Sequence, residues 1–213
     1  MPHPTPANLE LYEARLVQLA DSALADAVRR SGSHLACRPG CSQCCHGAFP
    51  LNALDARRLR AGMAALRISD PDRATRVKTR AVAWLAKHGL DFPGNVETGI
   101  LGTSEADELA FEDYANDTAC PALEPESGLC DLYSARPMTC RVFGPPVRSG
   151  EEGGLAVCEL CFTHAEPEEI AACEMLPPHQ QEDALLQQLP PSQRDTQTVV
   201  AFCLLPDYAP TAS

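Results

Sequence analysis

The sequence predicts a mainly α-helical fold, in which a small helical domain is joined to an irregular, cysteine-rich lobe with few short strands. Apolar residues recur at three- and four-residue spacing over several segments, as expected for amphipathic helices. Between residues 119 and 162, by contrast, prolines and glycines interrupt every candidate helix while cysteines recur. The chain has 213 residues, which suits one domain with appendages, and 45% of them are hydrophobic, enough for a buried core.

Helix signals are strongest in the first half of the chain. Asn52 is expected to cap one helix, and Ser69 or Asp70 another, with Pro71 in the first turn of the latter. Gly89 is expected to end that second helix. The spacing of apolar residues predicts helices over residues 8–30, 52–67, 70–88 and 104–114.

The rest of the chain shows fewer regular elements. Only residues 129–133 and 155–160 are candidate strands, and both stretches are short. Helical signal returns over residues 168–176 and 181–189, whereas residues 196–208 fit a helix or a strand. The predicted organisation has three parts, namely an N-terminal helix (1–36), a cysteine-cluster metal-binding domain (37–162) and a C-terminal helical extension (163–213).

Charge and hydropathy disfavour several classes of ligand. The net charge is −12 and the basic residues are scattered, so we expect no binding to nucleic acid or to an anionic membrane surface, which need concentrated positive charge. No apolar run approaches the roughly 18 residues of a membrane-spanning helix. The N-terminal residues lack a basic region followed by an apolar run, so we expect no secretory signal and a cytoplasmic location. Nothing in the sequence identifies a protein partner.

Cysteine is the most unusual feature of the composition. The chain has 11 cysteines, an odd number, and no predicted export signal, so disulfides are disfavoured. In a reducing compartment, clustered cysteines more often bind metal or carry out redox chemistry. The segment CRPGCSQCCHG, residues 37–47, holds four of them. Residues 119–162 hold five more in a stretch with little intrinsic order, which thiolate–metal bonds would cross-link.

The first block has the spacing of a thiolate site. Cys41 and Cys44 form a C-x-x-C, in which a tight turn aims both sulfurs at one ion, and Cys37 lies one turn earlier. Cys45 follows Cys44 directly, so its side chain diverges from that of Cys44. Cys45 is therefore a candidate ligand of another ion or a small buried hydrophobe. His46 is expected to hydrogen-bond near the site or to be exposed, rather than to bind metal.

The later cysteines leave more alternatives open. Cys158 and Cys161 form a second C-x-x-C, which fits a ligand pair, a redox pair or helix packing. Cys173 and Cys203 are isolated in apolar stretches and are expected to be buried, inert thiols. Several arginines near the cysteines would offset thiolate charge and lower thiol pKa values, or would simply be solvated. These arginines are Arg38, Arg136, Arg141 and Arg148.

Two blocks of the sequence together resemble one family. CRPGCSQCC, followed by a predicted helix, and then CPALEPESGLCDLYSARPMTCRVFG resemble the YkgJ family of zinc- or iron-chelating cysteine-cluster proteins. That family's later block reads C-P-x-L, C-x-[IV]-Y and R-P-x-x-C-R, and here Leu132 takes the aliphatic position. The resemblance covers residues 37 to about 145 and implies a metal-binding role for a set of cysteines. These are Cys37, Cys41, Cys44, Cys45, Cys120, Cys130 and Cys140.

Two enzyme families share part of this pattern. A relative, the flagellin lysine methylase, carries a similar cluster beside a methylating activity, but this chain is short for a second catalytic domain. The spacing of Cys37, Cys41 and Cys44 also matches the cluster motif of radical S-adenosylmethionine enzymes. Those enzymes rest on repeated strand–helix units, whereas here helices follow the cysteines without intervening strands. Neither activity is therefore expected from the sequence.

The sequence thus predicts a metal-chelating protein that holds iron as an iron–sulfur cluster. Two alternatives stay open, a structural zinc-binding interaction module without catalysis and a cluster-dependent redox or methyl-transfer enzyme. We also expect Cys37, Cys41 or Cys44 to share a metal centre with a cysteine between residues 120 and 140, because residues 119–162 cannot bury enough surface to fold alone. The expected ligands are Cys37, Cys41, Cys44, Cys45, Cys120, Cys130, Cys140, Cys158 and Cys161.

Overall fold

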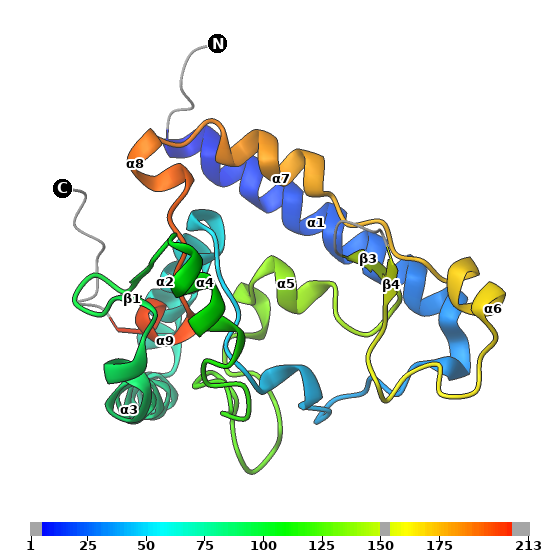
Figure 1. The fold of residues 1–213 in the computed structure, drawn as a ribbon, viewed down its shortest axis with the longest axis horizontal. Coiled ribbons are helices and arrows are strands. Elements are labelled where there is room, and N and C mark those ends of the chain that lie inside the picture. The colour runs from blue at the N-terminus through cyan, green and yellow to red at the C-terminus, as the bar shows by residue number, and fades with distance from the viewer. Residues whose placement is uncertain (1–5, 150–153, 206–213) are drawn as a thin grey trace. The chain divides into compact units, whose positions relative to one another are not determined.

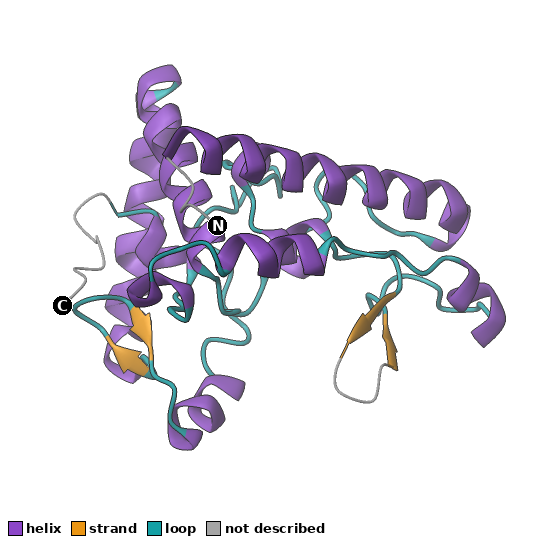
Figure 2. Ribbon diagram, turned by 90° about the horizontal axis from the view of Figure 1, so that it is seen from above, coloured by secondary structure: helices purple, strands orange, loops and turns teal. Residues whose placement is uncertain are grey.

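The computed structural model describes residues 6–149 and 154–205. Helices dominate the described residues, and the strands form two short antiparallel pairs, which confirms the predicted mainly α fold (Figure 1). The helices are α1 Pro6–Ser31, α2 Ala53–Ser69, α3 Pro71–His88, α4 Glu105–Glu112, α5 Met138–Arg141, α6 Pro167–Ala172, α7 His179–Leu186, α8 Pro191–Arg194 and α9 Val200–Cys203. The paired strands, orange in Figure 2, are β1 Gly94–Asn95 with β2 Ile100–Leu101, and β3 Val147–Ser149 with β4 Gly154–Ala156.

Helices α2 and α3 begin at the capping residues that the sequence predicts. The Asn52 side chain accepts a 3.0 Å hydrogen bond from the amide of Asp55 at the start of α2. Asp70 caps α3 through the amide of Arg73, also at 3.0 Å, and the proline that follows Asp70 is the first residue of the helix. Gly89 is the residue at which α3 ends. These caps confirm that short-range signals define α2 and α3.

The chain divides into two compact units, each made of two stretches. Unit 1 comprises residues 1–41 and 138–189, and unit 2 comprises residues 42–137 and 190–213. Each unit is therefore closed by residues far apart in the sequence. The three-part organisation expected from the sequence follows different boundaries and stays a prediction.

The core of unit 2 is formed by α2, α3 and α9, which contact one another. Leu59 and Met63 of α2 and Val77 of α3 are between 0 and 3% exposed. A Cβ atom at Gly62 would lie 2.3 Å from the Cβ of Ala135, so glycine permits the close approach of α2 to the 3₁₀ turn η4, Tyr133–Ala135. This packing fixes the end of the loop that carries the cysteines of unit 2.

In unit 1, α5 and α7 both pack against the long helix α1. Figure 1 shows α7, in orange, running along α1, in blue. Arg141 of α5 is only 3% exposed, and its Nη1 donates a 2.6 Å hydrogen bond to Oδ1 of Asp21 on α1. Arg30, near the end of α1, donates to the carbonyl oxygens of Ala172 and Glu174, at 2.7 and 2.9 Å, and so holds the C-terminus of α6.

The predicted strands are only partly present. Residues 129–133 form no strand, because Cys130 makes an isolated bridge to Leu123 and η4 begins at Tyr133. Of residues 155–160, only the first two lie in β4. The stretch 196–208 combines both of its expected conformations: Thr198 bridges Leu51, α9 follows, and residues 206–208 lie outside the described residues. Among the described helices, none is long and apolar enough to span a membrane.

Candidate metal centre

All eleven cysteines lie within the described residues and are free thiols. Eight of the nine predicted ligands form two groups of four, one in each unit, and within each group the thiols lie near one another. The unit-1 set is Cys37, Cys41, Cys158 and Cys161. The unit-2 set is Cys44, Cys45, Cys120 and Cys130. Each unit therefore brings together sulfurs from distant parts of the sequence.

Backbone pairing assembles the unit-2 set. The 3₁₀ turn η2, Gln43–Cys45, presents the two adjacent cysteines. The amide of Cys120 donates to the carbonyl oxygen of Cys45 at 2.7 Å, and the amide of Gly47 donates to the carbonyl oxygen of Thr118 at 3.0 Å. These two hydrogen bonds flank the bridge between His46 and Ala119, and they fix Cys120 beside the η2 turn.

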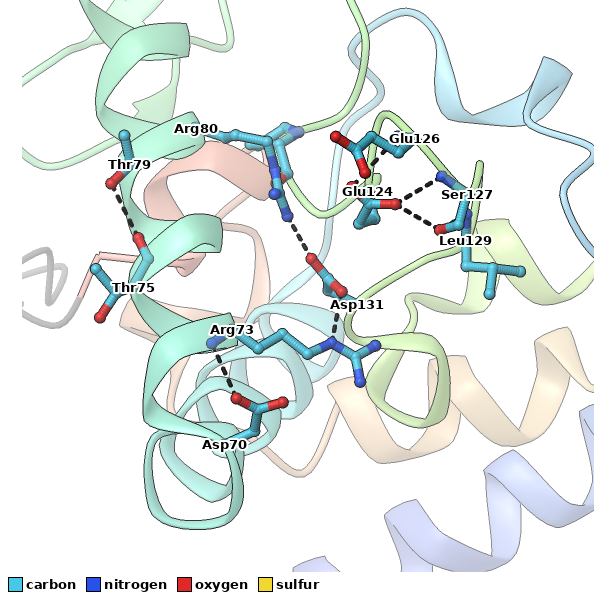
Figure 3. A network of polar contacts seen from close by, with 11 residues as sticks. Asp70, Arg73, Thr75, Thr79, Arg80, Glu124, Glu126, Ser127, Leu129 and Asp131 are labelled. Atoms are coloured by element: carbon cyan, nitrogen blue, oxygen red, sulfur yellow. Dashed lines mark hydrogen bonds and ion pairs between the residues drawn. The ribbon is translucent and has the colours of Figure 1, made fainter.

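The loop from Cys120 to Cys130 closes on itself. The amide of Leu123 donates to the carbonyl oxygen of Cys120 at 2.9 Å, and Leu123 bridges Cys130. At the tip, the Glu124 carboxylate accepts hydrogen bonds from the amide and the hydroxyl of Ser127, each at 2.6 Å (Figure 3). This closure returns Cys130 to the neighbourhood of Cys120 without a regular strand or helix.

Backbone amides point at the sulfurs of Cys120 and Cys130. Burial raises the pKa of Cys120 to about 12, while hydrogen bonds from the amides of Ala122 and Leu123 act in the opposite direction. Burial likewise raises the pKa of Cys130, and the amide of Leu132 opposes it. Amide donors stabilise the thiolate rather than the thiol, and thiolate is the form that binds metal. The amides of Ala122, Leu123 and Leu132 are therefore placed to stabilise these sulfurs once metal binding has displaced their protons.

The adjacent cysteines share a proton. A hydrogen bond from the thiol of Cys45 is the main cause that lowers the pKa of Cys44 to about 6, with smaller contributions from the positive charges of Arg136 and His46. The same hydrogen bond raises the pKa of Cys45, as do burial and the neighbouring thiols of Cys44, Cys120 and Cys130. One sulfur of the pair is thus set up as a thiolate and the other as its proton donor.

Arginines surround the unit-2 set. Figure 3 shows Arg73 and Arg80 of α3 reaching the buried carboxylate of Asp131, and Arg73 Nε lies 2.5 Å from Asp131 Oδ1. Arg136 lies over the ring of Tyr133, with its Cζ 4.1 Å from the ring centroid. The charge of Arg80 opposes the rise in the pKa of Cys120 that burial causes, and the charges of Arg73 and Arg136 oppose the rise at Cys130. Positive charge therefore favours thiolates at this set, although Asp131 offsets part of the effect.

The unit-1 set is centred on Cys161, which is 3% exposed. Its Sγ accepts a hydrogen bond from the amide of Ala36 at 3.4 Å, and it also hydrogen-bonds the thiols of Cys37 and Cys158. Desolvation and then Cys161 raise the pKa of Cys37 to about 12, and smaller contributions come from Cys41 and Cys158. The sulfur of Cys161 therefore links both halves of the unit-1 set.

Tight turns place the four sulfurs of this set. The amide of Cys161 donates to the carbonyl oxygen of Cys158 at 2.8 Å, and the amide of Cys41 donates to the carbonyl oxygen of Arg38 at 2.9 Å. The amide of Leu160 hydrogen-bonds the sulfur of Cys158, which opposes the rise in the pKa of Cys158 that burial causes. The C-x-x-C at 158–161 thus has an amide-to-sulfur contact similar to those of the unit-2 set.

Gly144 leaves room for Cys37. A Cβ atom at Gly144 would lie 2.8 Å from the Sγ of Cys37. The φ angle of Gly144 is +112°, a region that other residues rarely adopt. Both observations explain why glycine follows the R-P-x-x-C-R segment at this position, and they make Gly144 a structural part of the unit-1 set.

The donor types of both sets fit a metal, although neither set is closed around one. Within residues 6–149 and 154–205, no three side chains of histidine, cysteine, aspartate or glutamate already stand as ligands around one point. The sulfurs instead share protons with each other. Because metal binding displaces thiol protons, the contacts between Cys44 and Cys45 and between Cys37 and Cys161 are those that binding would replace.

The remaining cysteines and His46 lie outside the two sets. Cys140 is half-buried on α5, and its role as a ligand stays a prediction. His46 is exposed, with Nδ1 3.0 Å from the carbonyl oxygen of Ser42. Cys173 and Cys203 are 6% and 2% exposed, which confirms their predicted burial. Sequence reasoning missed the residues that support the sets, namely Arg73, Arg80, Asp131 and Gly144.

Comparison with known proteins gives one match. The model of the CxxCxxCC family, described as a "putative zinc- or iron-chelating domain", matches residues 36–161. The match includes all the residues of both sets. No curated protein and no solved structure matches the chain.

Proposed function

This chain belongs to the CxxCxxCC family of zinc- or iron-chelating domains, and we propose that it holds iron as an iron–sulfur cluster through clustered thiolates. The proposed ligands come from the nine cysteines between Cys37 and Cys161 that the sequence singled out. The cytoplasmic location remains a prediction.

The observation that carries this proposal is the unit-2 set. Four cysteines from two sequence blocks lie near one another there, and backbone amides donate to the sulfurs of Cys120 and Cys130. Nearby arginines add positive charge, which offsets the negative charge that several thiolates would bring together. Four cysteine thiolates are the usual ligands of iron–sulfur clusters, and hydrogen bonds to their sulfurs tune the reduction potential.

When bound, an iron–sulfur cluster supplies reversible one-electron chemistry. The protein's own part is to orient the ligands and to stabilise them as thiolates. Partial burial of Cys120 limits its contact with water, and the amides of Ala122 and Leu123 hold its sulfur in place. Arg80 contributes a second constraint, because its Nε donates a 2.9 Å hydrogen bond to the carbonyl oxygen of Pro121.

A structural zinc site is the second candidate, and one observation favours it. Two ligands of a tetrahedral site with metal–sulfur bonds of about 2.3 Å lie roughly 3.8 Å apart. The hydrogen bond between the thiols of Cys44 and Cys45 brings two sulfurs of the set together, as two ligands of one zinc ion must be. A cluster-dependent redox or methyl-transfer activity, the remaining alternative, would also require a substrate cleft beside the centre.

The test is metal analysis of the full chain purified without oxygen. We expect the purified protein to contain iron and acid-labile sulfide. It should be brown and absorb near about 400 nm, where thiolate-to-iron charge transfer lies. Colourless protein with bound zinc would establish the zinc alternative, and folded protein without metal would exclude both. Cys120→Ser should lower the metal content, whereas Cys203→Ala, a change at a buried cysteine of the same unit outside the set, should leave it unchanged.

A further inference from the structure

We propose that the unit-1 set and the unit-2 set are two separate metal centres, each complete within its own unit. This inference rests on the proposed function, because it assumes that the thiols bind metal. It adds the number of centres and the division of the ligands between them. Neither follows from the family match, which spans residues 36–161 as a whole.

The contacts around the cysteines divide along the boundary between the units. In unit 1, the amide of Ala36, next to Cys37, donates a 3.4 Å hydrogen bond to the Sγ of Cys161, and the amide of Cys161 donates to the carbonyl oxygen of Cys158. In unit 2, the amide of Cys120 donates a 2.7 Å hydrogen bond to the carbonyl oxygen of Cys45, and Cys130 bridges Leu123. The boundary falls after Cys41, within the segment that the sequence presented as one block. The contiguous cysteines of residues 37–45 therefore supply two different sets.

Each set also has the composition of a complete site. A tetrahedral thiolate site needs four sulfurs, and so does a cubane cluster. In the unit-1 set, Cys37 and Cys41 meet the C-x-x-C formed by Cys158 and Cys161. In the unit-2 set, two adjacent cysteines meet two from the following block. Each centre would thus close a long loop of chain, which restricts the unfolded state and stabilises the unit.

The supporting groups differ between the two sets. Cys120 and Cys130 pack against the apolar cluster built on α2 and α3. Cys158 and Cys161 lie in a separate apolar cluster with Phe162. A substitution in one set is therefore not expected to disturb the packing around the other, so the two centres can be removed and counted separately.

The experiment is a titration of the metal-free full chain with Co²⁺ under argon, followed by thiolate-to-cobalt absorption. Two variants remove one set each: Cys158→Ser with Cys161→Ser, and Cys120→Ser with Cys130→Ser. Two matched controls, Cys173→Ala in unit 1 and Cys203→Ala in unit 2, change a buried cysteine outside the sets. Far-ultraviolet circular dichroism checks that each variant is folded.

We expect wild-type protein and both controls to bind about two equivalents of Co²⁺, because each set supplies four thiolates. Each double variant should bind about one equivalent. Saturation of the wild type at about one equivalent would overturn the inference, even if no variant folds. So would loss of all Co²⁺ in a folded double variant. A wild-type chain that binds no Co²⁺ through thiolates, and carries no metal as purified, would instead refute the proposed function.

Discussion

The amide of Cys120 donates a 2.7 Å hydrogen bond to the carbonyl oxygen of Cys45. This contact joins the two cysteine blocks of unit 2 through the main chain. The arrangement means that the backbone, rather than the metal alone, brings Cys120 to the η2 turn. Metal binding would then complete a set that hydrogen bonding has partly assembled.

Gly144→Ala tests the unit-1 set without changing a ligand. The new Cβ would lie 2.8 Å from the sulfur of Cys37, at a φ of +112° that strains any side chain. We expect the unit-1 set to lose at least about tenfold in metal affinity, comparable to the loss of other supporting contacts around a metal. Competition with a chromophoric chelator measures this affinity.

Gly154→Ala is the matched control for that change. Gly154 lies in the same unit and has no positive φ angle, and a Cβ atom there would meet none of the described residues within 4 Å. Its substitution is expected to leave metal affinity within about twofold of the wild type, as for other exposed surface changes. Equal affinities in the two variants would show that Gly144 does not position Cys37.

Asp131→Asn tests the charge network beside the unit-2 set. The Asp131 side chain is 4% exposed and pairs with both Arg73 and Arg80. Removing its charge leaves two partly buried guanidinium groups without their carboxylate, which should lower the free energy of unfolding by about 2 kcal/mol. Urea denaturation of the metal-loaded proteins measures the change.

Asp26→Asn provides a surface comparison. Asp26 also pairs with two arginines, Arg29 and Arg30, but its side chain is 52% exposed. We expect a loss below about 1 kcal/mol, because solvent screens such pairs. A loss at Asp131 no larger than that at Asp26 would mean that the buried network does not stabilise the cysteine loop.

Metal removal is expected to loosen residues 119–162 more than the long helices. This stretch has few regular elements and a limited apolar core of its own, so it depends on cross-links. Trypsin should gain access to Arg141 and Arg148 after treatment with a strong chelator. Sites within α1 and α3, such as Arg15 and Arg76, should be cut no faster than before.

Equal cutting rates at Arg141 and Arg148 with and without chelator would show that metal does not cross-link residues 119–162. Mass spectrometry of the fragments identifies each site, and far-ultraviolet circular dichroism reports whether the helices persist.

Local chemistry explains which parts of the fold the sequence could predict. Asn52 and Asp70 cap their helices through amides only three residues away, so a short window of sequence contains the whole signal. The candidate strand at residues 129–133 does not form, for the opposite reason. There Cys130 bridges Leu123 and the chain turns into η4, an arrangement held by contacts with α2 and α3 that no local pattern encodes.

The candidate site shows the same limit. Cysteine spacing identified the thiols, but it did not show that Cys41 and Cys44 belong to different sets, since that depends on which distant segment each meets. The expected metal centre shared by Cys37, Cys41 or Cys44 with a cysteine between residues 120 and 140 stays a prediction. Nothing in the sequence distinguishes Asp131 from other acidic residues. Its carboxylate is buried in the fold because it pairs with Arg73 and Arg80 of α3.

His88 is expected to make stability depend on pH. Burial, and to a smaller extent Lys87, lowers the pKa of His88 below its ordinary value of 6.5, while Asp91 acts in the opposite direction. The unfolded chain therefore binds this proton more readily than the folded one. The stability that the neutral imidazole contributes is complete above about pH 6.5 and is lost as the pH falls below that value.

The measurement compares wild type with His88→Asn by urea denaturation between about pH 7 and pH 5, the range in which histidine titrates. The free energy of unfolding of the wild type should fall more steeply with decreasing pH than that of the variant. Protonation of His88 Nε2 removes its ability to accept the 2.9 Å hydrogen bond from Thr118 Oγ1. Effects of acid on the thiols are common to both proteins and cancel in the difference. Equal slopes would exclude His88 as the titrating group.

X-ray absorption spectroscopy at the metal edge of the anaerobically purified full chain tests the central claim, thiolate chelation, most directly. The account predicts a shell of sulfur ligands alone at about 2.3 Å from the metal, as four cysteine thiolates provide. An additional iron–iron contact would identify the cluster, and its absence with zinc bound would identify the structural site. A first shell dominated by nitrogen or oxygen would contradict the account.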